Sequence, residues 1–269
     1  NINYFYFITF ICSILIVSLI HNFEFITYRV FLYAHDLGVY PDVFKNWLLG
    51  LLCFVFLTLI VSLFNNKTFL KIWLIKSFIT LIFMLLYEYK YGIDAYMYYT
   101  RAIYVDDIGF FYNATDNIIF FTKMLSYIVG DSYYSLKITY SLLSFVGLIF
   151  IYKSYLIILN KSSLISCIQR DFIYILFLCP TILFWSSTLG KESLTLFFVG
   201  LFIFNFMKIL SAYKFVNIVF LITSVVGIYF IRPWWSIIFV LTIMLNSFDY
   251  KSKKQIIFFM IFPLSKDII

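Results

Sequence analysis

The stretch "WLLGLLCFVFLTLIVSLF", residues 47–64, decides the fold, because it runs for eighteen residues without a single charge. A helix needs about 20 apolar residues to cross roughly 30 Å of hydrocarbon. Similar runs recur along the chain, in which 64% of the 269 residues are hydrophobic and only 12% are charged. A soluble domain of this size does not need so much apolar surface. The alternating segments of about ten residues that build membrane barrels are absent from the sequence. The chain is therefore predicted to be an all-α polytopic membrane protein.

Further apolar runs on both sides of this stretch predict eight spans and the start of a ninth. Several of these runs approach or exceed the length that a helix needs to cross a bilayer. The expected spans are residues 4–20, 47–64, 69–87, 136–158, 172–187, 193–210, 215–231 and 234–247, with a ninth that starts near residue 255.

A polar and aromatic-rich segment, residues 88–135, separates the third span from the fourth. Its part "NIIFFTKMLSYIVG", residues 117–130, is too short and too charged to cross a bilayer. A short amphipathic helix is stable with its apolar face in the lipid boundary and its polar face in water. We therefore expect an interfacial helix in this segment.

The simplest division of the chain is a single transmembrane domain, residues 1–269. No repeat at a fixed period is visible in the sequence. Residue 1 is not methionine and no cleavage-site pattern follows it, so we expect a fragment or a processed chain. We interpret residues 1–68 as additional N-terminal spans, 69–247 as the core, and 248–269 as a truncated C-terminal span.

Lysine and arginine residues in alternate loops predict the orientation, because these residues are retained on the cytoplasmic side. One set of loops carries eleven basic and two acidic residues, whereas the other carries nine basic and eleven acidic residues in much longer loops. The N-terminus is therefore predicted to be cytoplasmic. This topology also accounts for the net charge of +7 without a nucleic-acid partner. The basic set is Lys67, Lys71, Lys76, Lys153, Lys161, Arg170, Lys208, Lys214, Lys251, Lys253 and Lys254.

Acidic residues on the predicted outer face follow the third span. Asp94 comes within about two helical turns of that span, and Asp106 and Asp107 follow shortly after. A carboxylate just outside the hydrocarbon can act as a general base on a hydroxyl, or bind a divalent cation through its oxygens. Loops that follow spans are often acidic simply because they are wet, so this alternative stays open.

Lys191 and Glu192 lie side by side at an expected membrane boundary, after Pro180 and Gly190. A helix N-terminus together with a lysine ammonium forms a site for an anion. Glu192 would hold Lys191 in place or cap the helix. The alternative is a lysine that extends from an ordinary turn to the membrane surface.

Arg232 stands at the outer end of another expected span, beside Pro233, Trp234 and Trp235. The planar guanidinium can donate two parallel hydrogen bonds to a phosphate. The tryptophans are equally typical of an aromatic belt that anchors a span at the interface. Asp94, Lys191 and Arg232 are all predicted at one membrane face, which is where a lipid-carried phosphate would lie.

Four motifs between residues 72 and 240 give the chain a family resemblance: "GIDAYMYY", "GDSYYSLKITYSLLSFVGLIFIYK", "CPTILFWSSTLGKESLTLFF" and "YFIRPWW". They resemble segments of the GT-C-type polytopic glycosyltransferases, which use polyprenyl-phosphate-linked sugars. The resemblance implies that Asp94 is the catalytic base or a ligand for Mg²⁺ or Mn²⁺, with Asp106 or Asp107 as a second acid. It also implies that Lys191 and Arg232 bind the donor phosphate. From their adjacency we expect Glu192 to orient Lys191.

The expected function is sugar transfer from a polyprenyl-phosphate carrier to an acceptor hydroxyl during assembly of cell-surface glycans. The expected partners are the lipid-linked donor, a glycan or lipid acceptor, and the membrane, which we expect to be the bacterial plasma membrane. A surface-polysaccharide polymerase needs the same phosphate-binding cations and stays open as an alternative. A non-catalytic subunit of a membrane complex, or a transporter, is a further alternative.

Overall fold

The computed structural model describes residue 11 and residues 42–91, 94–105, 113–159, 166–211 and 214–248. Over these residues the secondary structure is helical, with no strand, which confirms the all-α prediction. The elements are α4 (Val43–Ser62), α5 (Lys67–Phe78), η1 (Ile79–Phe83), α6 (Met84–Tyr91), α7 (Ala95–Tyr104), α8 (Ala114–Val129), α9 (Tyr133–Leu159), α10 (Ser166–Leu178), α11 (Pro180–Trp185), α12 (Lys191–Ser211), α13 (Phe215–Ile231) and α14 (Pro233–Phe248).

Among the described residues, four helical stretches are long and apolar enough to cross a membrane: Phe44–Ser62, Lys67–Glu88, Tyr133–Leu159 and Lys191–Ser211. Their mean hydropathy is 2.1 for the first three and 1.9 for the fourth. These stretches mark the chain as an integral membrane protein. Two apolar helices, α13 and α14, are shorter. The expected span at residues 4–20 and the ninth span lie outside the described residues.

The expected span at residues 172–187 is not one helix. Helix α10 ends at Leu178, α11 is a short helix of six residues, and the chain between Ser186 and Gly190 is not helical. The break arises because Pro180 has no N–H to continue α10 and disfavours the helical conformation at Cys179, which adopts φ −55° and ψ 121°. We call Ser186–Gly190 the unwound segment; all five of its residues are buried.

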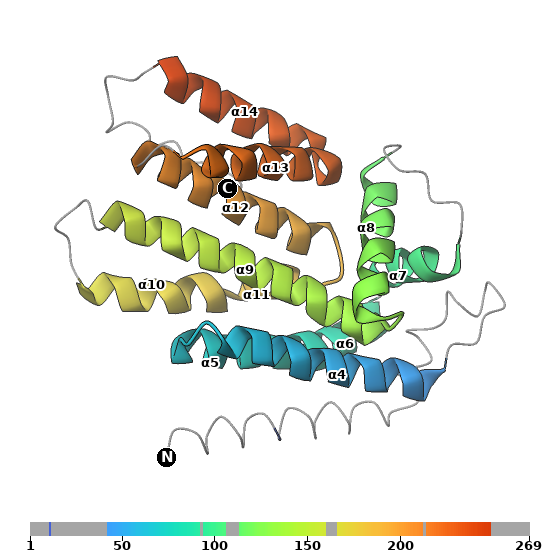
Figure 1. Cartoon of the computed structure of the whole chain (residues 1–269). Helices are drawn as coiled ribbons and strands as arrows, with labels where there is room; N and C mark the ends of the chain where they lie inside the picture. The colour runs from blue at the N-terminus through green and yellow to red at the C-terminus, as the bar shows by residue number, and fades with distance from the viewer. Residues whose placement is uncertain are drawn as a thin grey trace.

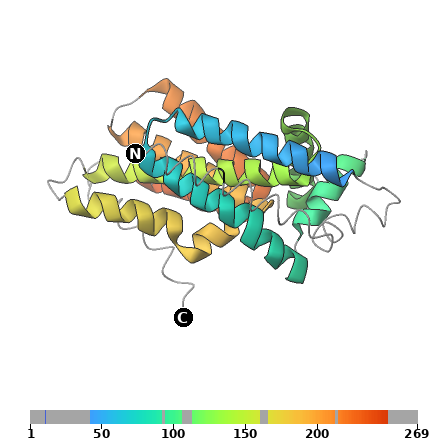
Figure 2. The same ribbon diagram turned by 90° about the horizontal axis from the view of Figure 1, so that it is seen from below.

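Helix α9 runs through the middle of the bundle, with α4 on one side and α12 on the other (Figures 1 and 2). Helix α13 packs on the far side of α12, and α14 packs on α13. Helices α9 and α12 run in the same direction, because Gly147 lies against Gly200 and Phe150 stacks on Phe204 further along both helices. The two glycines let the backbones approach closely, as small residues do in membrane helix pairs.

Helix α8 runs crosswise to α4, α9 and α12 at one end of the bundle (Figure 1). Its buried face includes Ile118 and Thr122, and the Thr122 hydroxyl lies 2.7 Å from the hydroxyl of Tyr140 on α9. Its opposite face exposes Tyr127 and Ile128, whose side chains are 75% and 78% exposed. Helix α7 packs beside α8. These two helices place the residues of the long segment over the ends of the apolar helices.

The span Lys67–Glu88 contains a π-helical turn, η1, of five residues. In a regular α-helix two residues twelve positions apart are turned by about 120° from each other. The wider π turn advances less per residue, and it brings Lys76 and Glu88 onto the face that packs against α9 and the unwound segment. Both side chains are fully buried.

Candidate functional site

Charged residues meet where α7 and α8 lie over the beginning of α12 and the end of α13. We call Asp94, Tyr98, Lys191, Glu192 and Arg232 the charged junction. Its shortest contact is the ion pair between Arg232 Nη2 and Glu192 Oε1 at 2.6 Å, in which the side chains are 38% and 34% exposed. A phosphate group in solution could therefore reach this pair.

Local sequence explains why Arg232 takes this position. Helix α13 ends at Ile231 because Pro233 cannot continue its hydrogen bonds, and Arg232 leaves the helical conformation with φ −144° and ψ 86°. The amide of Asn117 on α8 donates to the carbonyl of Phe230 at 3.0 Å. Helix α8 thus contacts the chain two residues before the arginine.

Lys191 and Glu192 begin α12 and contact different neighbours. Lys191 Nζ donates to the hydroxyl of Thr115 on α8 at 3.0 Å. Glu192 was expected to orient Lys191, but its carboxylate pairs with Arg232 instead. Consecutive residues of a helix point about 100° apart, so adjacent side chains do not face each other.

Asp94 joins the junction through Tyr98, one helical turn further along α7. Asp94 stands before the first residue of α7, yet its side chain makes no capping hydrogen bond. It is exposed, and its Oδ2 atom lies 3.5 Å from the Tyr98 hydroxyl, which donates toward it. The carboxylate is therefore close to α7 and open to solvent.

The ring of Tyr98 lies at the centre of the junction. A methyl group added to Gly190 would lie 3.3 Å from Glu192 Oε2 and 3.9 Å from Tyr98 Cε2, so both groups border the same point. The pKa of Tyr98 is raised to about 12, first by burial and then by the carboxylates of Asp94 and Glu192, and Arg232 opposes them. Sequence reasoning did not single out this tyrosine, which is one of 23 in the chain.

Two of the expected acids, Asp106 and Asp107, lie outside the described residues. Where the structure describes the chain, no group of three or more His, Cys, Asp or Glu side chains could hold a metal ion. A role for Asp94 in binding Mg²⁺ or Mn²⁺ thus stays a prediction that depends on those two aspartates.

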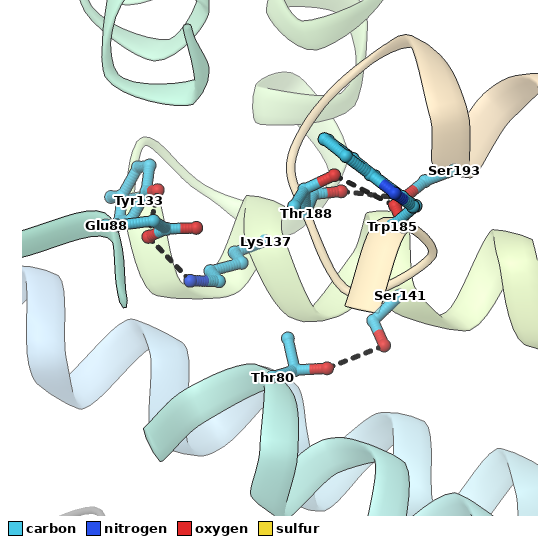
Figure 3. A network of polar contacts seen from close by, with 8 residues as sticks. All are labelled: Thr80, Glu88, Tyr133, Lys137, Ser141, Trp185, Thr188 and Ser193. Carbon is cyan, nitrogen blue, oxygen red and sulfur yellow. Dashed lines mark hydrogen bonds and ion pairs between the residues drawn. The ribbon is translucent and has the colours of Figure 1, made fainter. Parts of the chain in front are cut away.

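A second set of polar residues lies deeper in the bundle. Lys137 Nζ on α9 lies 2.6 Å from Glu88 Oε2, and the Tyr133 hydroxyl donates to the same oxygen at 2.8 Å (Figure 3). The ring of Tyr133 packs against Tyr96 and Tyr99 of α7, with centroids 5.1 Å and 5.4 Å apart. The buried ion pair therefore connects the end of one span to the helix that carries Tyr98.

Lys76 makes the other deep contact. It was counted among the residues of a cytoplasmic loop, but it is the tenth of the 22 residues of the span Lys67–Glu88 and is fully buried. Its ammonium donates to the carbonyl of Ser186 at 3.0 Å and contacts the hydroxyls of Ser186 and Ser187. The available signal was its place inside an apolar run, since charges there are usually retained for structure or function.

Comparison with protein-family models, with curated proteins and with solved structures finds no match to this chain. The resemblance to GT-C-type glycosyltransferases therefore stays a hypothesis that rests on the four motifs.

Proposed function

We propose that this membrane protein transfers a sugar from a polyprenyl-phosphate carrier to an acceptor hydroxyl, at the membrane face where the charged junction lies. The observation that supports the proposal is the gathering of Asp94, Lys191 and Arg232 at one end of the bundle. Sugar transfer from a lipid phosphate needs an acid–base group and cations together at the rim of the bilayer.

The two cations would bind the donor phosphate. Arg232 has five N–H donors, and the Nη2 contact with Glu192 uses one side of the guanidinium. Its remaining donors and the two free protons of the Lys191 ammonium suit the oxygens of a phosphate. Glu192 fixes the direction of the guanidinium, because an ion pair with one short contact limits its rotation.

Asp94 would act on the acceptor. Its carboxylate takes the proton of the acceptor hydroxyl while that oxygen forms a bond to the anomeric carbon of the sugar. The bond between the anomeric carbon and the phosphate oxygen breaks, and its electron pair stays on the phosphate. Lys191 and Arg232 neutralise this charge as it develops. The Tyr98 hydroxyl holds the carboxylate at the beginning of α7.

The surroundings of the junction suit a lipid-borne substrate. Trp234 and Trp235 follow Arg232 and are 80% and 46% exposed, and tryptophan is enriched where hydrocarbon meets headgroups. The crosswise α8 would lie in the same interface with its exposed Tyr127 and Ile128 toward lipid.

For the whole chain we propose eight or nine spans, a cytoplasmic N-terminus and a location in the bacterial plasma membrane.

Purified protein in lipid nanodiscs, supplied with a polyprenyl-phosphate-linked sugar and an acceptor glycan, tests the proposal. Asp94→Asn should lower transfer at least 100-fold, because an amide cannot accept the proton. Asp42→Asn is the matched control, since Asp42 caps α4 by accepting from the Lys45 amide and asparagine caps equally well. Full transfer by the Asp94 variant would remove this residue from the mechanism.

The length of the product separates the two enzymatic alternatives. A transferase adds one sugar to each acceptor, whereas a polymerase joins lipid-linked repeat units into a ladder of products. Lipid-linked and surface glycans of a strain that lacks the protein provide the corresponding test in cells. Unchanged glycans in that strain would argue against both activities.

A further inference from the structure

The carbonyl of Ser186 accepts hydrogen bonds from three separate elements. Lys76 of α5 donates at 3.0 Å, Ser144 of α9 at 2.7 Å, and Ser193 of α12 at 3.2 Å. Ser186 is the first residue of the unwound segment, whose backbone is not helical and so lacks regular helical hydrogen bonds. Backbone that is not helical at membrane depth is tolerated only where other groups replace those bonds.

The depth of this contact follows from Lys76. Because it is the tenth of 22 residues in its span, Ser186 lies against the middle of that helix. Both side chains are almost completely shielded, with exposed fractions of 0% for Lys76 and 2% for Ser186. An ammonium in such a place is unfavourable unless its protons are bound, and here serine oxygens bind them.

We propose that Lys76 is a positioning residue that holds the unwound segment at a fixed depth and thereby places Lys191 and Glu192 at the charged junction. The importance of this placement for activity rests on the proposed function, whereas the placement itself does not. Lys76 does not touch the junction, so it acts through the backbone.

Contacts within the segment transmit the position of Ser186 to α12. The Ser193 hydroxyl bonds the carbonyl of Thr188 at 2.6 Å as well as that of Ser186 (Figure 3 shows Thr188, Trp185 and Ser193). The Thr188 hydroxyl in turn donates to the carbonyl of Trp185 at 2.9 Å. Only four residues separate Ser186 from Lys191, so a shift of this carbonyl moves the start of α12.

Hydrogen exchange of the backbone amides in residues 186–191 tests the placement directly. Lys76→Met keeps the length of the side chain and removes its donors, so we expect exchange about tenfold faster in this segment, as for loss of a buried hydrogen bond. Lys67→Met is the matched control, because Lys67 begins the same helix, is exposed, and should leave exchange unchanged. Unchanged exchange in Lys76→Met would overturn the proposal.

A milder variant covers the case in which Lys76→Met does not assemble. Ser144→Ala removes a second donor to the same carbonyl without removing a charge, and it should accelerate exchange in the same residues by a smaller factor. If both variants fold, their double variant should exchange more slowly than the product of the two effects predicts, since they share one acceptor. If the two accelerations simply multiply, Lys76 and Ser144 do not act through the Ser186 carbonyl as a shared acceptor.

Binding of undecaprenyl phosphate to nanodiscs that contain the protein separates the placement from the proposed function. We expect Lys76→Met to weaken binding about tenfold and Lys67→Met to leave it unchanged. Faster exchange with unaltered lipid binding would show that the placement by Lys76 has no effect on binding at the charged junction. This result would overturn the claim that Lys76 matters for the proposed function. If the unsubstituted protein does not bind the lipid, the proposed function fails, and the exchange result alone decides the placement.

Discussion

Nη2 of Arg232 lies 2.6 Å from Oε1 of Glu192, and this ion pair joins the end of α13 to the first turn of α12. Because more than a third of the arginine side chain is exposed, the pair stabilises the fold by only about 0–1 kcal/mol. Its effect should therefore appear in the use of substrate rather than in folding.

Replacement of Arg232 tests this expectation. Arg232→Lys keeps the charge and loses the planar fork, so KM for the lipid-linked donor should rise about tenfold while the unfolding temperature changes little. Glu192→Gln keeps a hydrogen bond to the guanidinium and should have the smaller effect. Equal donor KM values for lysine and arginine at this position would contradict two-point binding of a phosphate.

We expect the phenol of Tyr98 to lose its proton at a pH well above the ordinary value of 10. Its pKa is raised to about 12 by burial and then by the carboxylates of Asp94 and Glu192, so this phenol stays protonated up to high pH. The raised pKa contributes stability that is fully present below the ordinary value of 10 and is lost as pH rises toward 12. Subtracting the ultraviolet absorbance titration of Tyr98→Phe from that of the unsubstituted protein isolates this group. A difference curve centred near pH 10 would contradict the burial described for the ring.

The buried pair of Glu88 and Lys137 predicts strongly non-additive stability changes. Glu88→Gln leaves a buried ammonium without its acid partner and should reduce the free energy of unfolding by about 3–5 kcal/mol. Lys137→Met leaves a buried carboxylate and should reduce it by a similar amount. The double variant Glu88→Gln with Lys137→Met removes both charges and should lose less than either single variant. Thermal unfolding in detergent measures all three, and simple addition would contradict a direct pair.

The crossing of α9 and α12 predicts a large effect of one methyl group. An alanine side chain at Gly200 would overlap the backbone of Gly147, which cannot move without separating the helices. We expect Gly200→Ala to reduce the free energy of unfolding by about 1–3 kcal/mol. Gly227→Ala is the control, because the nearest atoms there belong to the ring of Phe198, which is a side chain and can rotate. A larger loss at Gly227 would contradict the close backbone approach.

The sequence predicted the helical membrane class because long uncharged runs have few other solutions. It also predicted four stretches that are long and apolar enough to span, to within a few residues. It did not predict the break at Cys179, because a proline in an apolar run can either kink a helix or end it. Here it ends the helix, because Cys179 before it leaves the helical conformation.

The charged junction was less accessible to sequence reasoning. Asp94, Lys191 and Arg232 were expected at one face from charge counts alone, and the structure places Tyr98 near Asp94, Glu192 and Arg232. No sequence spacing distinguishes Tyr98 from its neighbours on α7. Lys76 was also missed as a buried lysine, because it was counted with the loop residues although it lies inside an apolar run. Glu88 pairs with Lys137 of α9, and no local spacing reveals a contact between such distant parts of the sequence.

Helix α8 contacts Lys191 and the backbone of Phe230, two residues before Arg232, through residues two positions apart. Thr115 accepts from the Lys191 ammonium, and Asn117 donates to the carbonyl of Phe230 just before Arg232. Helix α8 is thus a common neighbour of the first residue of α12 and of the last turn of α13. A displacement of this one helix would therefore disturb both sides of the charged junction.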